Sequence, residues 1–140
     1  MNVNSRYILK PDVRKSSEIK HHYDNAPGLR YVFLDRAKLP ETSLYTIVRA
    51  VKDLLPGQAP YIDPHTHNCD SEFLFIGDNE DLTGLTAYVW LGEERFLVES
   101  PASVFIPRNV LHNVQLLSGS GKFINIVLHS DYNQSLASGK

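Results

Sequence analysis

The stretch that decides the fold is DPHTHNCDSEFLFIG, residues 63–77, in which two histidines precede a short run of apolar and aromatic residues. In a β-strand, residues i and i+2 point to the same face, so extended backbone would place His65 and His67 side by side. Two neighbouring imidazoles can bind one metal ion, and neutral imidazole is the commonest metal ligand in proteins. The stretch therefore indicates either a metal site beside a strand or a polar loop that leads into a core strand.

The rest of the chain is typical of short strands separated by turns. Glycine and proline interrupt it often, and the segments between them are rich in β-branched and aromatic residues. Such spacing favours an all-β sandwich or barrel. We expect strands at 29–35, 43–51, 71–77, 85–91, 95–100, 102–107, 112–117 and 122–129, with a hairpin tip at 92–94 and a turn at 118–121.

Length and composition exclude several classes of protein. The 140 residues suffice for one domain with a sizeable core. The net charge of −2 and the lack of a basic block argue against nucleic-acid binding. No apolar run approaches the roughly 18 residues of a membrane span. The single cysteine, Cys69, excludes an intramolecular disulfide, and the N-terminus lacks the apolar core of a secretory signal, so we expect a cytoplasmic protein.

A third histidine follows a second apolar strand. In SPASVFIPRNVLHN, residues 100–113, the strand ends at Pro107 and His112 comes after a tight corner. An imidazole at the start of a strand, after such a corner, could meet His65 and His67 across a closed barrel.

These two stretches resemble the paired motifs of the cupin superfamily, G-x5-H-x-H-x3–4-E-x6-G and G-x5-P-x-G-x2-H-x3-N. His65 and His67 match the first motif, and Glu72 is placed where its glutamate is expected. Pro107 and His112 keep the spacing of the second motif. Three glycine positions of the motifs carry other residues here, namely Ala59, Pro101 and Asn109.

The resemblance implies a cupin-type double-stranded β-helix, which is a small jelly-roll barrel, over residues 29–130. Residues 1–28 would form an N-terminal arm and residues 131–140 a frayed C-terminal tail. The resemblance also implies one divalent metal ion held by His65, His67 and His112, with Glu72 as a possible fourth ligand. Fe(II) is our first expectation, and Zn(II) or Mn(II) would suit the same ligands.

The position of Glu72 depends on strand parity, because adjacent residues of a strand cannot share a face. If Phe73 and Phe75 point inward, Ser71 does so too and Glu72 points outward. The opposite parity would make Glu72 a ligand. The sequence leaves both open, and the alternative to a four-residue site is a three-histidine site completed by water or substrate.

Besides Glu72, two residues are candidates for catalysis. Arg49 interrupts an apolar strand, so it could anchor a carboxylate or enolate of a substrate, or it could extend outward into solvent. Tyr61 could line the mouth of the barrel, or it could stay solvated in its loop. We expect Cys69 to be buried rather than a ligand, and His21 and His22, in the polar arm, to be solvated.

The function that these features predict is a metal-dependent enzyme acting on a small molecule, most simply an oxygenase. Isomerase, cyclase or lyase chemistry without redox change is the first alternative, and a ligand-binding or sensing protein without turnover is the second. The resemblance further implies a homodimer.

Overall fold

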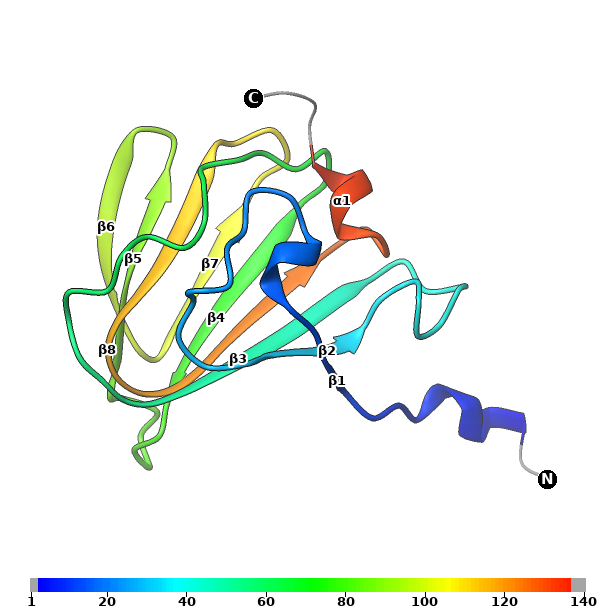
Figure 1. Ribbon diagram of the computed structural model, residues 1–140, viewed down its shortest axis with the longest axis horizontal. Coiled ribbons are helices and arrows are strands. Elements are labelled where there is room, and N and C mark those ends of the chain that lie inside the picture. Colours follow the sequence, from blue (N-terminus) through cyan, green and yellow to red (C-terminus); the bar gives the residue numbers. More distant parts are fainter. Residues whose placement is uncertain (1–2, 137–140) are drawn as a thin grey trace.

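The chain folds into one antiparallel sheet that bends around a core, as the computed structural model describes it for residues 3–136 (Figure 1). The hydrogen-bonded order is β1-β2-β3-β8-β4-β7, with β5 pairing with both β6 and β8. The strands are β1 (Asp12–Val13), β2 (Arg30–Leu34), β3 (Tyr45–Leu54), β4 (Ser71–Gly77), β5 (Leu85–Leu91), β6 (Glu94–Glu99), β7 (Ala102–Ile106) and β8 (His112–Val127). The all-β prediction is confirmed.

The long strand β8 joins the two halves of the sheet. Its first half pairs with β5, and its second half pairs with β3 on one side and β4 on the other. The turn predicted at 118–121 is wrong, because β8 continues through these residues. A Cβ atom on Gly119, where φ is +100°, would lie 1.9 Å from the carbonyl oxygen of Gly84. The glycines therefore let neighbouring backbones approach closely where β8 changes partners.

Strict alternation places the core on one face of each strand. In β4 the buried residues are Ser71, Phe73, Phe75 and Gly77, and the residues between them are only partly covered. Phe73 and Phe75 pack against Phe123 of β8, with ring centroids 5.0 and 5.4 Å apart. These aromatic side chains thus form part of the core inside the barrel.

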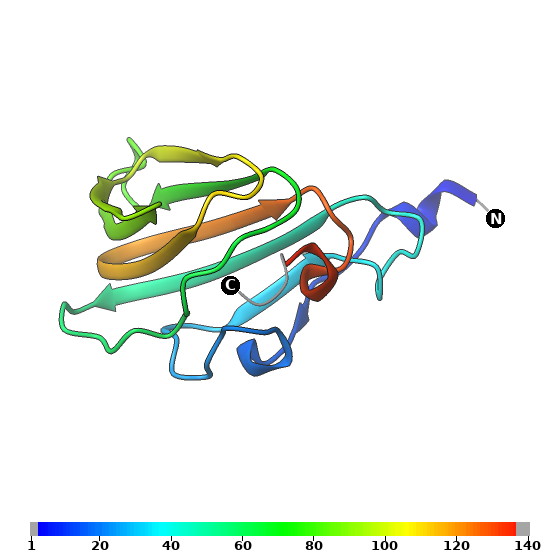
Figure 2. The same ribbon diagram turned by 90° about the horizontal axis from the view of Figure 1, so that it is seen from above.

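The N-terminal arm turns back onto the barrel. The 3-10 helix η1 (Val3–Tyr7) projects away from the strands in both views (Figures 1 and 2), and β1 follows it. After β1, the 3-10 helix η2 (Ser16–Glu18) is followed by Ile19, which is buried in the core.

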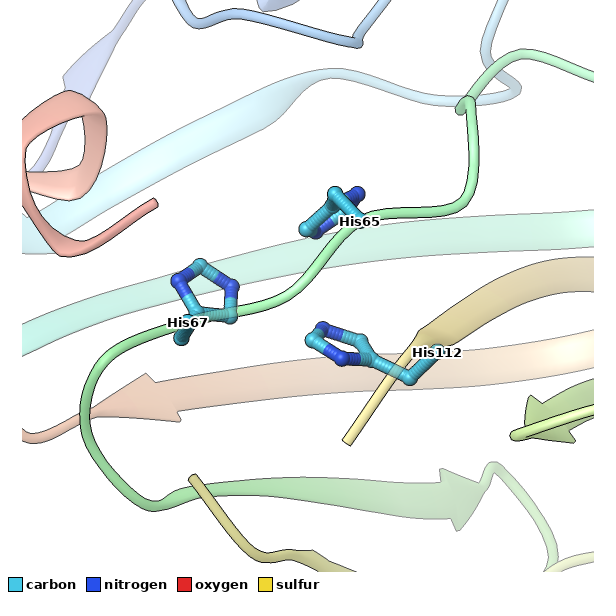
Figure 3. A group of neighbouring side chains, drawn as sticks. All are labelled: His65, His67 and His112. Carbon is cyan, nitrogen blue, oxygen red and sulfur yellow. The ribbon is translucent and has the colours of Figure 1, made fainter. Parts of the chain in front are cut away.

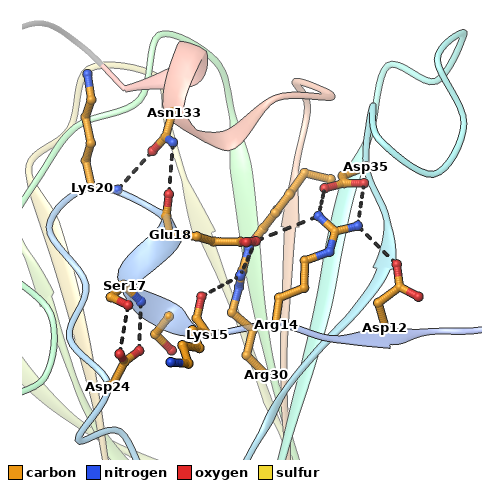
Figure 4. A network of polar contacts seen from close by, with 12 residues as sticks. Asp12, Arg14, Lys15, Ser17, Glu18, Lys20, Asp24, Arg30, Asp35 and Asn133 are labelled. Atoms are coloured by element: carbon orange, nitrogen blue, oxygen red, sulfur yellow. Dashed lines mark hydrogen bonds and ion pairs between the residues drawn. The ribbon is translucent and has the colours of Figure 1, made fainter.

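Ion pairs hold this arm in place (Figure 4). Arg14 donates to both carboxylate oxygens of Asp35, and Arg30 of β2 donates to Glu18 at 2.8 Å. Because the Arg30 side chain is only 3% exposed, its pairing with Glu18 compensates a buried charge. The arm is therefore part of the wall of the barrel.

The C-terminal residues also pack onto the barrel, contrary to the frayed tail that we expected. Helix α1 (Tyr132–Ser135) is capped by Asp131, whose side chain accepts a hydrogen bond from the Gln134 amide. Tyr132 and Ser135 are buried. Residues 137–140 of the expected tail lie outside the described residues. Among the residues described, no helix is long and apolar enough to cross a membrane.

Candidate metal centre

Three histidines meet at one end of the barrel (Figure 3). His65 and His67 lie in the segment between β3 and β4, and His112 is the first residue of β8. The backbones of His65 and His112 bond each other in both directions, at 3.1 and 2.9 Å, so the loop is fastened to the strand at this point. One ring nitrogen of each histidine lies within 4.8 Å of those of the other two. The structure therefore brings together the three histidines that the sequence predicted.

The hydrogen bonds of the three rings leave the same nitrogen of each ring directed at the centre. Nδ1 of His65 lies 2.7 Å from the carbonyl oxygen of Asp63, and Nδ1 of His112 lies 2.9 Å from that of Val110. A carbonyl oxygen can only accept, so each Nδ1 carries the hydrogen and each Nε2 has a free lone pair. Such outer partners orient metal-binding histidines in proteins.

The ring of His67 is oriented by a hydroxyl group. Its Nδ1 lies 2.7 Å from Oγ of Ser135, and that hydroxyl donates its own hydrogen to the carbonyl oxygen of Tyr132 at 2.6 Å. Oγ is therefore the acceptor, and Nδ1 of His67 is again the donor. All three Nε2 atoms are thus available to one ion.

Burial keeps these imidazoles neutral. His65, His67 and His112 are 3%, 2% and 2% exposed. Burial, with a smaller contribution from His112, lowers the pKa of His65 to about 2 and that of His67 to about 3. Burial also lowers the pKa of His112. Since metal ligands must be unprotonated, the cluster is ready to bind a cation at neutral pH.

This donor set fits one divalent ion. Three imidazoles without a fourth protein ligand are typical of catalytic rather than structural metal sites, because open positions remain for water or substrate. Imidazole nitrogen suits Zn(II), Fe(II) and related ions, so the donor type alone does not select among them.

Glu72 does not join the histidine cluster. The prediction that Glu72 is a metal ligand and a catalytic residue is therefore wrong. The parity of β4 turns Ser71 inward, and Glu72 lies on the opposite face, paired with Phe105 of β7 and Ile126 of β8. Ser71, Phe73 and Phe75 share the inner face of β4. Because neighbouring residues of a strand point to opposite faces, the side chain of Glu72 cannot lie on that inner face. The three-histidine alternative is the one the structure adopts.

Three residues at the site were missed by sequence reasoning. His22, expected in solvent, lies with its ring centroid 5.3 Å from that of His65, and burial lowers its pKa to about 4. Tyr132 and Ser135 come from the segment expected to fray. Oη of Tyr132 lies 2.9 Å from Nε2 of His65. No motif spacing connects these residues to the histidines, so only the fold could reveal them.

A cavity of about 30 Å³ lies beside His65 and His112. The residues that line it include His65, His112, Tyr132, Arg49 and Asn125. Oδ1 of Asn125 is buried and has no hydrogen-bond partner among the described residues. A buried, unpaired oxygen is costly unless a ligand or water satisfies it.

Arg49 points into the barrel, not into solvent. It is 7% exposed and donates to Oγ of Ser16 at 2.8 Å and to the carbonyl oxygens of Pro27 and Gly28 at 3.3 Å. No carboxylate of the described residues forms an ion pair with it. Burial lowers its pKa, and the neighbouring positive charge of Arg30 lowers it further.

Tyr61 also lines the cavity. It is buried, and its hydroxyl accepts a hydrogen bond from the Leu116 amide at 2.8 Å. Burial raises its pKa to about 12. The hydroxyl of Tyr61 is therefore engaged in holding the loop to β8. Cys69 is partly buried against the core and is not one of the clustered ligands.

Comparisons with known proteins agree with this architecture. No protein-family model matches the chain, and no curated protein matches its sequence. Among solved structures, a cupin 2 domain-containing protein from Halorhodospira halophila aligns with a TM-score of 0.56 and 17% identity, over 80% of this chain and 70% of that one. A protein from Planctomyces limnophilus aligns with a TM-score of 0.51 and 16% identity, over 86% and 90% of the two chains.

Oxalate decarboxylase from Bacillus subtilis is a further structural neighbour. A variant of that enzyme aligns with a TM-score of 0.55 and 16% identity over 91% of this chain. The chain spans about a third of the enzyme's length, since the alignment covers 32% of it. At such identities the likeness concerns architecture alone. The order of the strands, the histidine cluster and these neighbours together identify this chain as a small protein with the cupin fold.

Proposed function

We propose that the protein is a metal-dependent enzyme that acts on a small anionic molecule, with one divalent ion held by His65, His67 and His112. The observation that carries the proposal is the buried cluster of three neutral imidazoles, each with Nδ1 held by an acceptor and Nε2 unprotonated. Core packing does not require three such groups to face one another, since burying polar side chains costs free energy.

The charge of the cavity supports an anionic substrate. Three neutral imidazoles leave the full charge of a divalent ion uncompensated, and Arg49 adds a buried guanidinium without a carboxylate partner among the described residues. An unpaired buried charge costs several kcal/mol, so a carboxylate or enolate would be favoured there. Arg49 would hold the anionic group, and Oδ1 of Asn125 would accept a hydrogen bond from the same molecule.

The reaction class follows from the open positions of the site. A bound ion would polarise a substrate oxygen as a Lewis acid or activate dioxygen. We favour Fe(II) and oxygenase chemistry on an enol, diketone or thiol. Zn(II) or Mn(II), with isomerase, cyclase or lyase chemistry, is the second candidate, and the Mn(II) centres named for the structurally similar oxalate decarboxylase support it. In both cases the buried wall around His65 keeps bulk water from the reacting atoms.

Metal analysis of protein purified without chelator is the first test. We expect about one divalent ion per chain in the wild type and none in the His65→Ala/His112→Ala double variant. Glu72→Ala is the matched control, because it removes a nearby carboxylate that faces away from the cluster. A double variant with as much metal as the wild type would refute the proposed site.

Turnover is the second test, and it separates an enzyme from a binding protein. Metal-loaded protein is assayed for oxygen consumption and for product formation with small carboxylates that carry an enol, ketone or thiol group. Arg49→Met should raise the KM for these acids while leaving the metal content unchanged. Binding of the acids without product would instead support the sensing alternative.

A further inference from the structure

Helix α1 brings a phenol to the metal-binding nitrogen of His65. Tyr132 is 4% exposed, and its Oη lies 2.9 Å from Nε2 of His65. Its ring also packs edge-on against that of His67, with centroids 4.9 Å apart. The hydroxyl group therefore lies beside the position that an ion bound to His65 would take.

The hydrogen of this hydroxyl has two acceptors. Nε2 of His65 is an acceptor because Nδ1 donates to Asp63. Nε2 of His22 lies 3.3 Å from Oη, and it is an acceptor as well, because Nδ1 of His22 lies 2.7 Å from the carbonyl oxygen of Lys20. A phenol has one hydrogen to donate, so it can satisfy one of these nitrogens at a time.

An ion would decide between the two acceptors. Coordination consumes the lone pair of Nε2 of His65, so the O–H group of Tyr132 must then turn to His22. That rotation leaves the oxygen lone pairs directed at the ion. Oη and Nε2 of His65 lie 2.9 Å apart, so both atoms would be within reach of one ion.

The rest of the C-terminal segment is built into the same site. Ser135, one turn after Tyr132, holds Nδ1 of His67, and the Ser135 carbonyl oxygen accepts the Asn68 amide at 2.6 Å. Leu136 forms a β-bridge with His67. The segment is thus fastened to the histidine loop directly after the phenol.

We propose that Tyr132 is the fourth protein ligand of the metal centre, bound through its phenolic oxygen while His22 accepts its hydrogen bond. This inference rests on the proposed metal site. Tyr132 of helix α1 would then supply the oxygen ligand that was expected from Glu72, whose side chain points away from the histidines.

Cobalt and zinc binding to the full chain test the assignment. We compare wild type with Tyr132→Phe, which removes only the oxygen, and with Tyr45→Phe, which removes a buried hydroxyl bonded to Arg30 on the same cavity. Tyr132→Phe should change the visible spectrum of the Co(II) protein and weaken Zn(II) binding about 10- to 100-fold, measured by competition with a chromogenic chelator. Tyr45→Phe should keep the wild-type spectrum and an affinity within about threefold.

A measurement on the wild type removes any dependence on the folding of a variant. With tyrosine labelled by ¹³C at Cζ, one of the seven tyrosine signals should shift when diamagnetic Zn(II) is added, because binding of the phenolic oxygen changes the shielding of its Cζ. The assignment is overturned if all seven signals stay in place and Tyr132→Phe keeps the wild-type spectrum and affinity. Failure of the wild type to bind any metal would instead overturn the proposed function, so the two failures are distinguishable.

Discussion

Acid should destabilise the metal-free protein through its buried histidines. The pKa values of His65 and His67 lie near 2 and 3 in the folded chain, against an ordinary value of 6.5 in the unfolded chain. Between these limits the unfolded chain binds more protons than the folded one, so the free energy of unfolding falls as the pH falls. The loss begins near pH 6.5 and continues towards pH 3.

The magnitude follows from the same values. Between pH 7 and pH 5, each histidine that is protonated only after unfolding lowers the free energy of unfolding by about 2 kcal/mol. His65 and His67 together therefore contribute about 4 kcal/mol, and the lowered pKa values of His22 and His112 add to this. Since domains of this size are stable by about 5–15 kcal/mol, the effect is a large share of the total.

The assay is urea denaturation of chelator-treated protein at pH 7, 6 and 5, followed by the fluorescence of the single tryptophan, Trp90. The wild type should lose at least about 4 kcal/mol between pH 7 and pH 5. The His65→Gln/His67→Gln variant is the control, and its loss should be smaller by about that amount. The reasoning is refuted if the wild type loses less than about 1 kcal/mol or if the double variant loses as much as the wild type.

Four further outcomes are expected. Ser135→Ala should lower zinc affinity about 10- to 100-fold, because Nδ1 of His67 loses its acceptor; an affinity within twofold of wild type would contradict this role. Glu72→Gln should leave the metal-to-chain ratio unchanged in elemental analysis, and a lower ratio would restore Glu72 as a ligand. Gly119→Ala should cost about 3 kcal/mol or more in urea denaturation, since its Cβ would collide with the backbone of Gly84; a cost under about 1 kcal/mol would argue against this packing. The homodimer stays a prediction, which sedimentation equilibrium of the wild type tests.

Local patterns were sufficient for most of the strands. Alternating apolar and polar residues, bounded by glycine and proline, indicate where strands lie, because side chains of a strand alternate between two faces. The same local rule fails at residues 118–121. Ser-Gly-Ser-Gly is typical of a turn when read alone, and only the close approach of β3, β4 and β5 makes the glycines part of a continuous strand.

The sequence by itself determined the fold class and the three histidines, because His65, His67 and His112 occupy recognisable positions relative to the strands beside them. The tertiary structure alone decided the rest of the site. The direction of the Glu72 side chain depends on which face of β4 packs against the core. The alternation of side chains along the strand is the same whether Glu72 points inward or outward. His22 and Tyr132 reach His65 from opposite ends of the chain, through contacts that span 43 and 67 residues of sequence. Such contacts form because distant parts of the chain pack around the same core. The spacing of residues in the sequence does not predict them.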